Sequence, residues 1–147
     1  MNCGQTKLVE HLLKQISVAF DGVPRPKTTK SVARGYDDEW VLSEERIVEL
    51  SNLDPEQKWT DVTEDGIKFF QEYFTFSDAE GWRFYLPAHM VFYLKGFPDY
   101  GWDAVYKACT RPDPKFDLLT PDQMRCVAAF LELIHEEERS RTSRYRQ

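Results

Sequence analysis

Apolar residues recur at spacings of three and four near the start of the chain, which is the pattern of a helix with one buried face. They are Leu8, Val9, Leu12, Leu13, Ile16, Ala19 and Phe20, and the pattern ends at Asp21-Gly22, before Pro24 and Pro26. A second apolar set between Trp40 and Leu50 favours a helix over roughly 38–52, closed by Asp54-Pro55. A strand over Glu39 to Leu42 is the alternative for part of this second set.

Residues 22–35 separate these two predicted helices and carry little apolar surface. They include two prolines, two glycines and four basic residues. A segment of this composition buries too little apolar area to offset the entropy cost of ordering it. We therefore predict a flexible connection here, with no helix or strand.

Residues that cap helices mark three later helix starts. Thr63 precedes Glu64-Asp65, two acids that the positive end of a helix dipole favours. Ser77-Asp78-Ala79-Glu80 indicates a capping box with Ser77 as the cap. Thr120-Pro121-Asp122-Gln123 combines a cap, a proline at the first helical position and a glutamine as the capping partner. A shorter periodic stretch runs from Tyr100 to Cys109.

The middle of the chain is predicted to form the core. The stretch from Phe69 to Tyr106 holds 14 of the 21 aromatic residues, and Pro87 must interrupt or kink the helix that begins near residue 78. After Glu138 the apolar pattern gives way to Arg and Ser, so residues 139–147 are predicted to be a frayed basic tail. The sequence thus predicts an all-α fold: one compact domain over residues 1–147, of about five to six helices, with a proline-kinked central helix.

Charge is distributed unevenly along the chain. Residues 1–35 and 139–147 each carry a net charge of +4, whereas residues 36–138 carry −14 and the whole chain −6. An acidic body repels phosphate backbones, so we expect no nucleic-acid partner and, instead, a cationic protein partner. Binding of nucleic acid through the Arg-rich tail is the alternative, and it predicts that deleting residues 139–147 abolishes such binding.

Several other classes of site lack their usual sequence signals. No apolar run approaches the length that spans a bilayer, and no secretory leader pattern follows Met1, so a cytoplasmic protein without membrane contact is expected. Cys3, Cys109 and Cys126 have no ligand spacing and indicate reduced thiols, the last two packed in the core. Neither a metal motif nor a glycine-rich phosphate loop is present, so no metal and no cofactor is expected.

Four side chains near Pro87 are the candidates for ligand binding: Glu80, Arg83, Tyr85 and His89. Arg83 could bind an anion, but an ion pair with Glu80 that holds the kinked helix is the favoured interpretation, because buried charges are usually paired. His89 follows Tyr85 by four residues and could do acid–base chemistry, yet no nucleophile or second carboxylate is placed beside it. A hydrogen-bonded structural histidine is the favoured alternative, and no catalytic residue is assigned.

The run Gly81-Trp82-Arg83-Phe84-Tyr85-Leu86-Pro87-Ala88 resembles a motif, Gly-x-Arg-[Phe/Tyr]-Tyr-Leu-Pro-Ala, of a family of small uncharacterised bacterial proteins. Leu119-Thr120-Pro121-Asp122-Gln123 is similar to the start of that family's C-terminal helix. The likeness covers about residues 65–138 and implies no activity. Some bacterial immunity and scaffold proteins resemble the chain more loosely, in their acidic character and their aromatic-Leu-Pro runs.

These observations rank the functional classes. A non-enzymatic protein-interaction or regulatory module, immunity-like and with an acidic surface, accounts for the charge distribution and comes first. A small-molecule binder or small enzyme with a pocket beside the Pro87 kink is the alternative.

Overall fold

The computed structural model describes residues 1–146, and within this range the chain is entirely helical, with no strand. The prediction of a single all-α domain is confirmed. Five of the seven α-helices are at least eight residues long. In chain order the elements are α1 (Cys3–Ala19), α2 (Lys30–Glu39), α3 (Glu44–Ser51), the 3-10 helix η1 (Trp59–Asp61), α4 (Glu64–Phe69), the 3-10 helix η2 (Tyr73–Thr75), α5 (Ala79–Lys95), α6 (Ala104–Cys109) and α7 (Pro121–Arg146).

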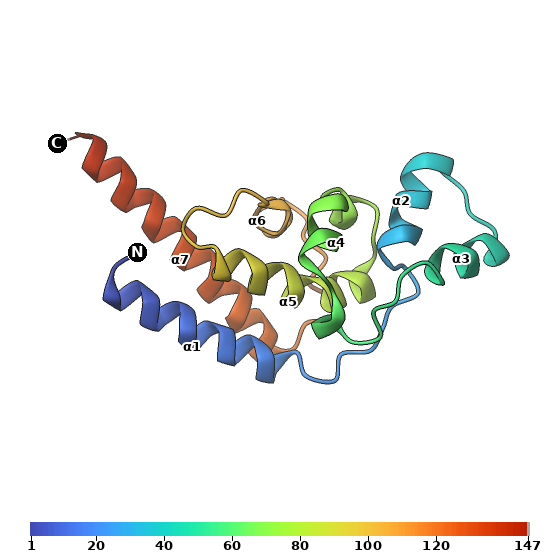
Figure 1. Ribbon diagram of the computed structural model, residues 1–147, viewed down its shortest axis with the longest axis horizontal. Coiled ribbons are helices and arrows are strands. Elements are labelled where there is room, and N and C mark those ends of the chain that lie inside the picture. The colour runs from blue at the N-terminus through green and yellow to red at the C-terminus, as the bar shows by residue number, and fades with distance from the viewer. Residues whose placement is uncertain (147) are drawn as a thin grey trace.

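Helix α5 runs through the middle of the molecule, and the other elements are arranged around it (Figure 1). Helices α1 and α7 pack against each other, and α1 also packs on α5. Helices α2 and α3 form a hairpin at one end of the molecule, and the two ends of the chain lie at the opposite end (Figure 1). None of the helices in residues 1–146 is long and apolar enough to cross a bilayer.

The ring-rich segment forms the core, as predicted. Trp82, Phe84, Leu86 and Met90 of α5 are each 0% exposed, and Phe20 and Phe130 bring α1 and α7 to the same cluster. Cys109 and Cys126 are buried in that core, whereas Cys3 is exposed. Pro87 lies inside α5 without ending it, so the helix is not interrupted there, and the predicted kink stays a prediction.

The cap of α5 differs from the predicted one. Asp78 is the cap, and its side chain accepts a hydrogen bond from the Gly81 amide at 2.9 Å. The Ser77 hydroxyl instead donates to the Tyr73 hydroxyl at 2.7 Å, which in turn donates to the Thr28 carbonyl at 2.6 Å. Because a Cβ at Gly81 would overlap both hydroxyls, the glycine makes this buried chain of hydrogen bonds possible.

The prediction of a connection without helix or strand fits residues 22–29, but it is wrong for residues 30–35. Helix α2 begins at Lys30, and Thr29, Val32 and Ala33 are each 0% exposed. The segment has few apolar residues, but it is fixed by polar contacts to residues 51–56. Arg25 alone donates to the carbonyls of Ser51, Asp54 and Glu56, at 2.8–2.9 Å.

The predicted start of the helix over 38–52 is also wrong. The chain turns between Glu39 and Glu44, and α3 begins after Ser43, whose side chain accepts from the Arg46 amide at 3.1 Å. The alternative of a strand over Glu39 to Leu42 is not formed either. A serine cap inside the apolar pattern divides it into two elements.

Helix α7 starts as predicted, with reciprocal hydrogen bonds between Thr120 and Gln123 at 2.9 and 3.1 Å. It does not end at Glu138 but continues to Arg146, so the predicted frayed tail is helical over its described residues. Ion pairs along and beside the helix, including Arg139 with Glu132, replace apolar burial there. Gln147, the last residue of the predicted tail, lies outside the described residues.

Candidate functional site

The four candidate side chains near Pro87 do not come together as one site. Glu80 is exposed, and none of the ion pairs in residues 1–146 involves Arg83, so the predicted pair between them is not formed. The Arg83 Nε is buried without a hydrogen-bond partner among residues 1–146. Arg83 therefore does not clamp the helix through Glu80.

Tyr85 and His89 are both buried and pack on Tyr73 and Phe74 of η2, but they differ in their polar contacts. The Tyr85 hydroxyl donates to Glu56 Oε1 at 2.7 Å and accepts from the Lys30 amide at 3.2 Å. Burial, and then the nearby charge of Glu56, raise the pKa of Tyr85 far above its ordinary value.

His89 is 3% exposed and packs edge-on against the Phe74 ring, with the ring centroids 4.8 Å apart. Burial lowers the pKa of His89 to about 3, so the imidazole is neutral near pH 7. Its Nδ1 has no hydrogen-bond partner in the described part of the chain. The predicted hydrogen bond of a structural histidine is thus absent at this nitrogen, and packing against aromatic rings holds the side chain.

A hollow of about 330 Å³ lies against α5, and its lining includes Ala88, the residue that follows Pro87. Ala88, Val91 and Phe92 of α5 line it together with Trp59 and residues of α1. None of the four candidate side chains contributes to its lining, which is largely apolar. A second hollow, of about 390 Å³, lies between α1 and α7 and is lined by His11, Lys14 and Arg125 among others.

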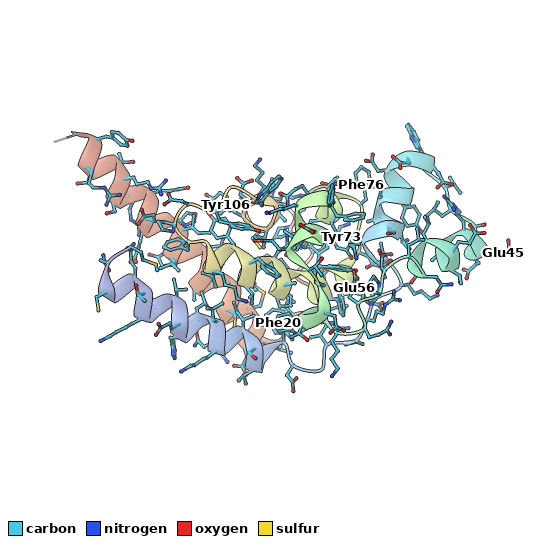
Figure 2. All side chains as sticks on the ribbon, in the orientation of Figure 1. Phe20, Glu45, Glu56, Tyr73, Phe76 and Tyr106 are labelled. Carbon is cyan, nitrogen blue, oxygen red and sulfur yellow. The ribbon has the colours of Figure 1, made fainter. Side chains whose placement is uncertain are left out.

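A buried ionic cluster is the most polar part of the interior, and the sequence did not point to it. Asp54 and Glu56 are only 3% and 2% exposed. The Lys30 Nζ donates to both Glu56 oxygens at 2.7 Å and lies 3.4 Å from Asp54 Oδ1. Figure 2 shows Glu56 lying inward among the central elements. Buried carboxylates need such partners, since an unpaired one costs several kcal/mol.

This cluster also caps α2. Thr29 occupies the cap position without a side-chain bond to the helix, and groups from elsewhere in the chain take over that role. Asp54 Oδ2 accepts from the Ser31 amide at 2.9 Å, and the Tyr85 hydroxyl accepts from the Lys30 amide. Helix α2 is therefore fixed to α5 and to the 54–56 turn. The sequence signal that could have indicated it is the acid-Pro-acid turn, Asp54-Pro55-Glu56, since acids are favoured beside a helix start.

The outer part of the α2–α3 hairpin is strongly acidic. Residues 36–53, which we call the acidic arm, hold six carboxylates and one arginine, a net charge of −5 within the −14 of residues 36–138. Arg46 pairs with Glu39 and Glu49 at 3.0 Å. The other four carboxylates of the arm are exposed and make no ion pair within the described residues: Asp37, Asp38, Glu44 and Glu45. Glu45 lies at the end of the molecule farthest from the chain ends (Figure 2).

In the part of the chain described here, no three His, Cys, Asp or Glu side chains are placed to hold a metal ion. The arm carboxylates instead form a spread, solvent-exposed surface. Such a surface attracts cations and basic proteins at long range.

A family of unknown function (DUF6714) matches the chain over residues 9–147, well beyond the residues 65–138 on which the resemblance rests. No curated protein and no solved structure matches the chain.

Proposed function

We propose that this chain, which belongs to the DUF6714 family of unknown function, is a non-enzymatic interaction or regulatory module that binds a cationic protein through its acidic arm. One observation carries the proposal: four exposed carboxylates of the arm have no cation partner within the described chain. Unpaired surface charges of one sign speed the encounter with an oppositely charged protein and select against acidic ones.

The way the arm is anchored supports the same function. The buried contacts of Lys30 and Ser31 with Asp54 and Glu56 fix the start of α2 on the body. A surface held in one orientation loses less entropy on binding than a mobile one. The contacts at Lys30 and Ser31 thus fix the base from which the charged surface extends.

The test is an affinity capture from a cell extract with three immobilised proteins. The first is the unchanged chain, and the second carries Asp37→Asn, Asp38→Asn, Glu44→Gln and Glu45→Gln. The matched control removes the same number of exposed, unpaired carboxylates elsewhere, with Glu10→Gln, Asp65→Asn, Asp117→Asn and Glu136→Gln.

We expect the unchanged chain and the control to retain the same basic protein, and the arm variant to lose it. Raising the salt from about 0.15 M to about 1 M should release it, because the screening length falls from about 8 Å to about 3 Å. Equal loss from both variants would mean that only net charge matters. Retention of neutral or acidic proteins alone would contradict the proposal.

A small-molecule site is the second candidate, and the hollow against α5 supports it. A metabolite that fills it should raise the melting temperature of the unchanged protein. Val91→Trp places an indole at the edge of the hollow and should abolish that rise. A metabolite screen that gives no rise would exclude this candidate.

A further inference from the structure

Trp40 lies in a strained turn at the tip of the acidic arm. Its φ is 68° and its ψ is −45°, and the Val41 amide donates to the Glu39 carbonyl at 2.7 Å. This is the γ-turn with positive φ, which is rare and strained. A bulky residue such as tryptophan is unusual in this backbone region, where glycine would be accommodated without strain.

The strain is combined with exposure of two large apolar side chains. Trp40 is 83% exposed and Val41 84%, whereas Trp59 and Trp82 are buried. Burying such a side chain is worth about 1.5–3 kcal/mol, and the fold obtains none of this at the tip. A tryptophan at this position thus contributes to folding neither through the turn geometry nor through side-chain packing.

We propose that Trp40 and Val41 are the anchor with which the acidic arm binds a basic segment of a partner protein. Apolar side chains of the segment pack on the indole and on Val41, and its Lys and Arg side chains pair with the four free carboxylates of the arm. This inference rests on the proposed function and names the contact through which it operates. Lys and Arg can also lie over the indole face, as Lys68 does at 5.8 Å from the Trp102 ring.

The surface beside the tip has room for a peptide chain. Tyr36 precedes Trp40 by one helical turn, and it lines a hollow of about 580 Å³ with Ile47 and Val48 of α3. Toward the base of the arm the same hollow is lined by Arg25, Lys27 and Asp78. Val48 is itself 58% exposed. A segment anchored at Trp40 can therefore place an apolar side chain against Tyr36, Ile47 and Val48, at the end of the hollow away from Arg25 and Lys27.

A foreign segment fits this surface better than the basic end of a second copy does. The arginine side chains described at that end are already neutralised within the chain: Arg139 by Glu132, Arg141 by Asp99 and Glu137, and Arg144 by Glu137. Moving them to another copy would exchange one set of ion pairs for another. A basic segment without internal partners gains its pairs outright.

The test uses a random-peptide display library selected on the intact protein. We expect the enriched peptides to combine several Lys or Arg with at least one large apolar residue. In a ¹⁵N-labelled sample the chain gives four tryptophan indole signals. An enriched peptide, made synthetically, should shift the Trp40 signal and leave that of Trp102, the matched exposed tryptophan, unchanged. The signals of Trp59 and Trp82 should also stay, since their indoles donate to the Phe20 and Phe74 carbonyls in the interior.

Variants decide whether the anchor is essential. Trp40→Ala should weaken binding of the peptide by about tenfold or more, as expected for a central aromatic contact, and Trp102→Ala should not. If the arm variant with four neutralised carboxylates loses binding while Trp40→Ala keeps it, Trp40 is not the anchor. The inference is then overturned, whereas the proposed function still stands. Enrichment of neutral or acidic peptides only would overturn both. Concentration-dependent dimers in sedimentation, abolished by Trp40→Ala, would make a second copy the occupant and also overturn the inference.

Discussion

Helix α5 and the acidic arm show two opposite uses of apolar and charged residues. In α5, 11 of the 17 residues are buried, and rings from both sides close over it. In α3 only Leu50 is buried, and the arm turns Trp40 and Val41 into solvent. The body is stabilised by packing, whereas the arm is held by a few polar contacts at its base. Aromatic residues therefore form the folding core in one region, and in the other they lie exposed on the surface that we propose for partner binding.

The largest expected effect tests whether the rings of the two regions differ in this way. Phe84→Ala should lower the free energy of unfolding by about 3–5 kcal/mol, because it leaves a cavity in the core. Trp40→Ala should change it by less than about 0.5 kcal/mol, as for an exposed site. Urea unfolding followed by circular dichroism measures both. Similar losses for the two variants would break the comparison.

A second test removes the polar base of the arm. Lys30→Met leaves Glu56 and Asp54 buried without their cation, which should cost about 3 kcal/mol. The exposed Lys27→Met is the matched control and should be nearly neutral. Hydrogen exchange should show faster exchange of the α2 amides in the Lys30 variant. Unchanged α2 protection would mean that the arm is held by its few apolar contacts instead.

A third test uses the pH dependence of the core. Because burial lowers the pKa of folded His89 from 6.5 to about 3, the unfolded chain binds a proton between these pH values that the folded protein does not. Stability should therefore fall as the pH decreases through this window, by on the order of 1 kcal/mol for each pH unit. His89→Leu should remove this part of the slope, and the exposed His11→Leu should retain it. Urea midpoints measured from pH 7 to pH 5 provide the comparison, and an unchanged slope in His89→Leu would contradict it.

The smallest expected effect concerns the strained turn. Trp40→Gly should raise the free energy of unfolding by about 0.5–1 kcal/mol, since glycine adopts a positive φ without steric cost. The same variant should lose binding of the basic peptide. Thermal unfolding compared with Trp40→Ala separates backbone strain from the side chain. A loss of stability in the glycine variant would show that the turn is not strained.

The sequence predicted those parts of the fold that depend on local signals. Thr120 and Gln123 cap α7 by contacts three residues apart, so the motif contains both partners. Helix α2 depends on Asp54 and on Tyr85, which lie 23 and 55 residues away from their partners in α2. Periodicity within residues 22–35 carries no trace of such distant contacts, and the helix was missed for that reason.

The candidate residues near Pro87 were grouped because they are close in sequence on one helix. Tyr85 and His89 lie on one face of α5 and pack on the neighbouring rings of Tyr73 and Phe74, but only Tyr85 reaches Glu56. Glu80, at the start of the same helix, is exposed. The apolar pattern places Trp40 on the apolar face of a helix over 38–52. Since the chain turns after Glu39, that side chain points to solvent instead.

The positions of the three thiols make the protein easy to label at a site remote from the arm. Cys3 is exposed on α1, at the end of the molecule opposite α3, while Cys109 and Cys126 are shielded (Figure 1). Burial also raises the pKa of Cys109 to about 12, so that thiol stays protonated and unreactive at neutral pH. A maleimide dye or a biotin linker should therefore attach at Cys3 alone and leave the opposite face free for a partner.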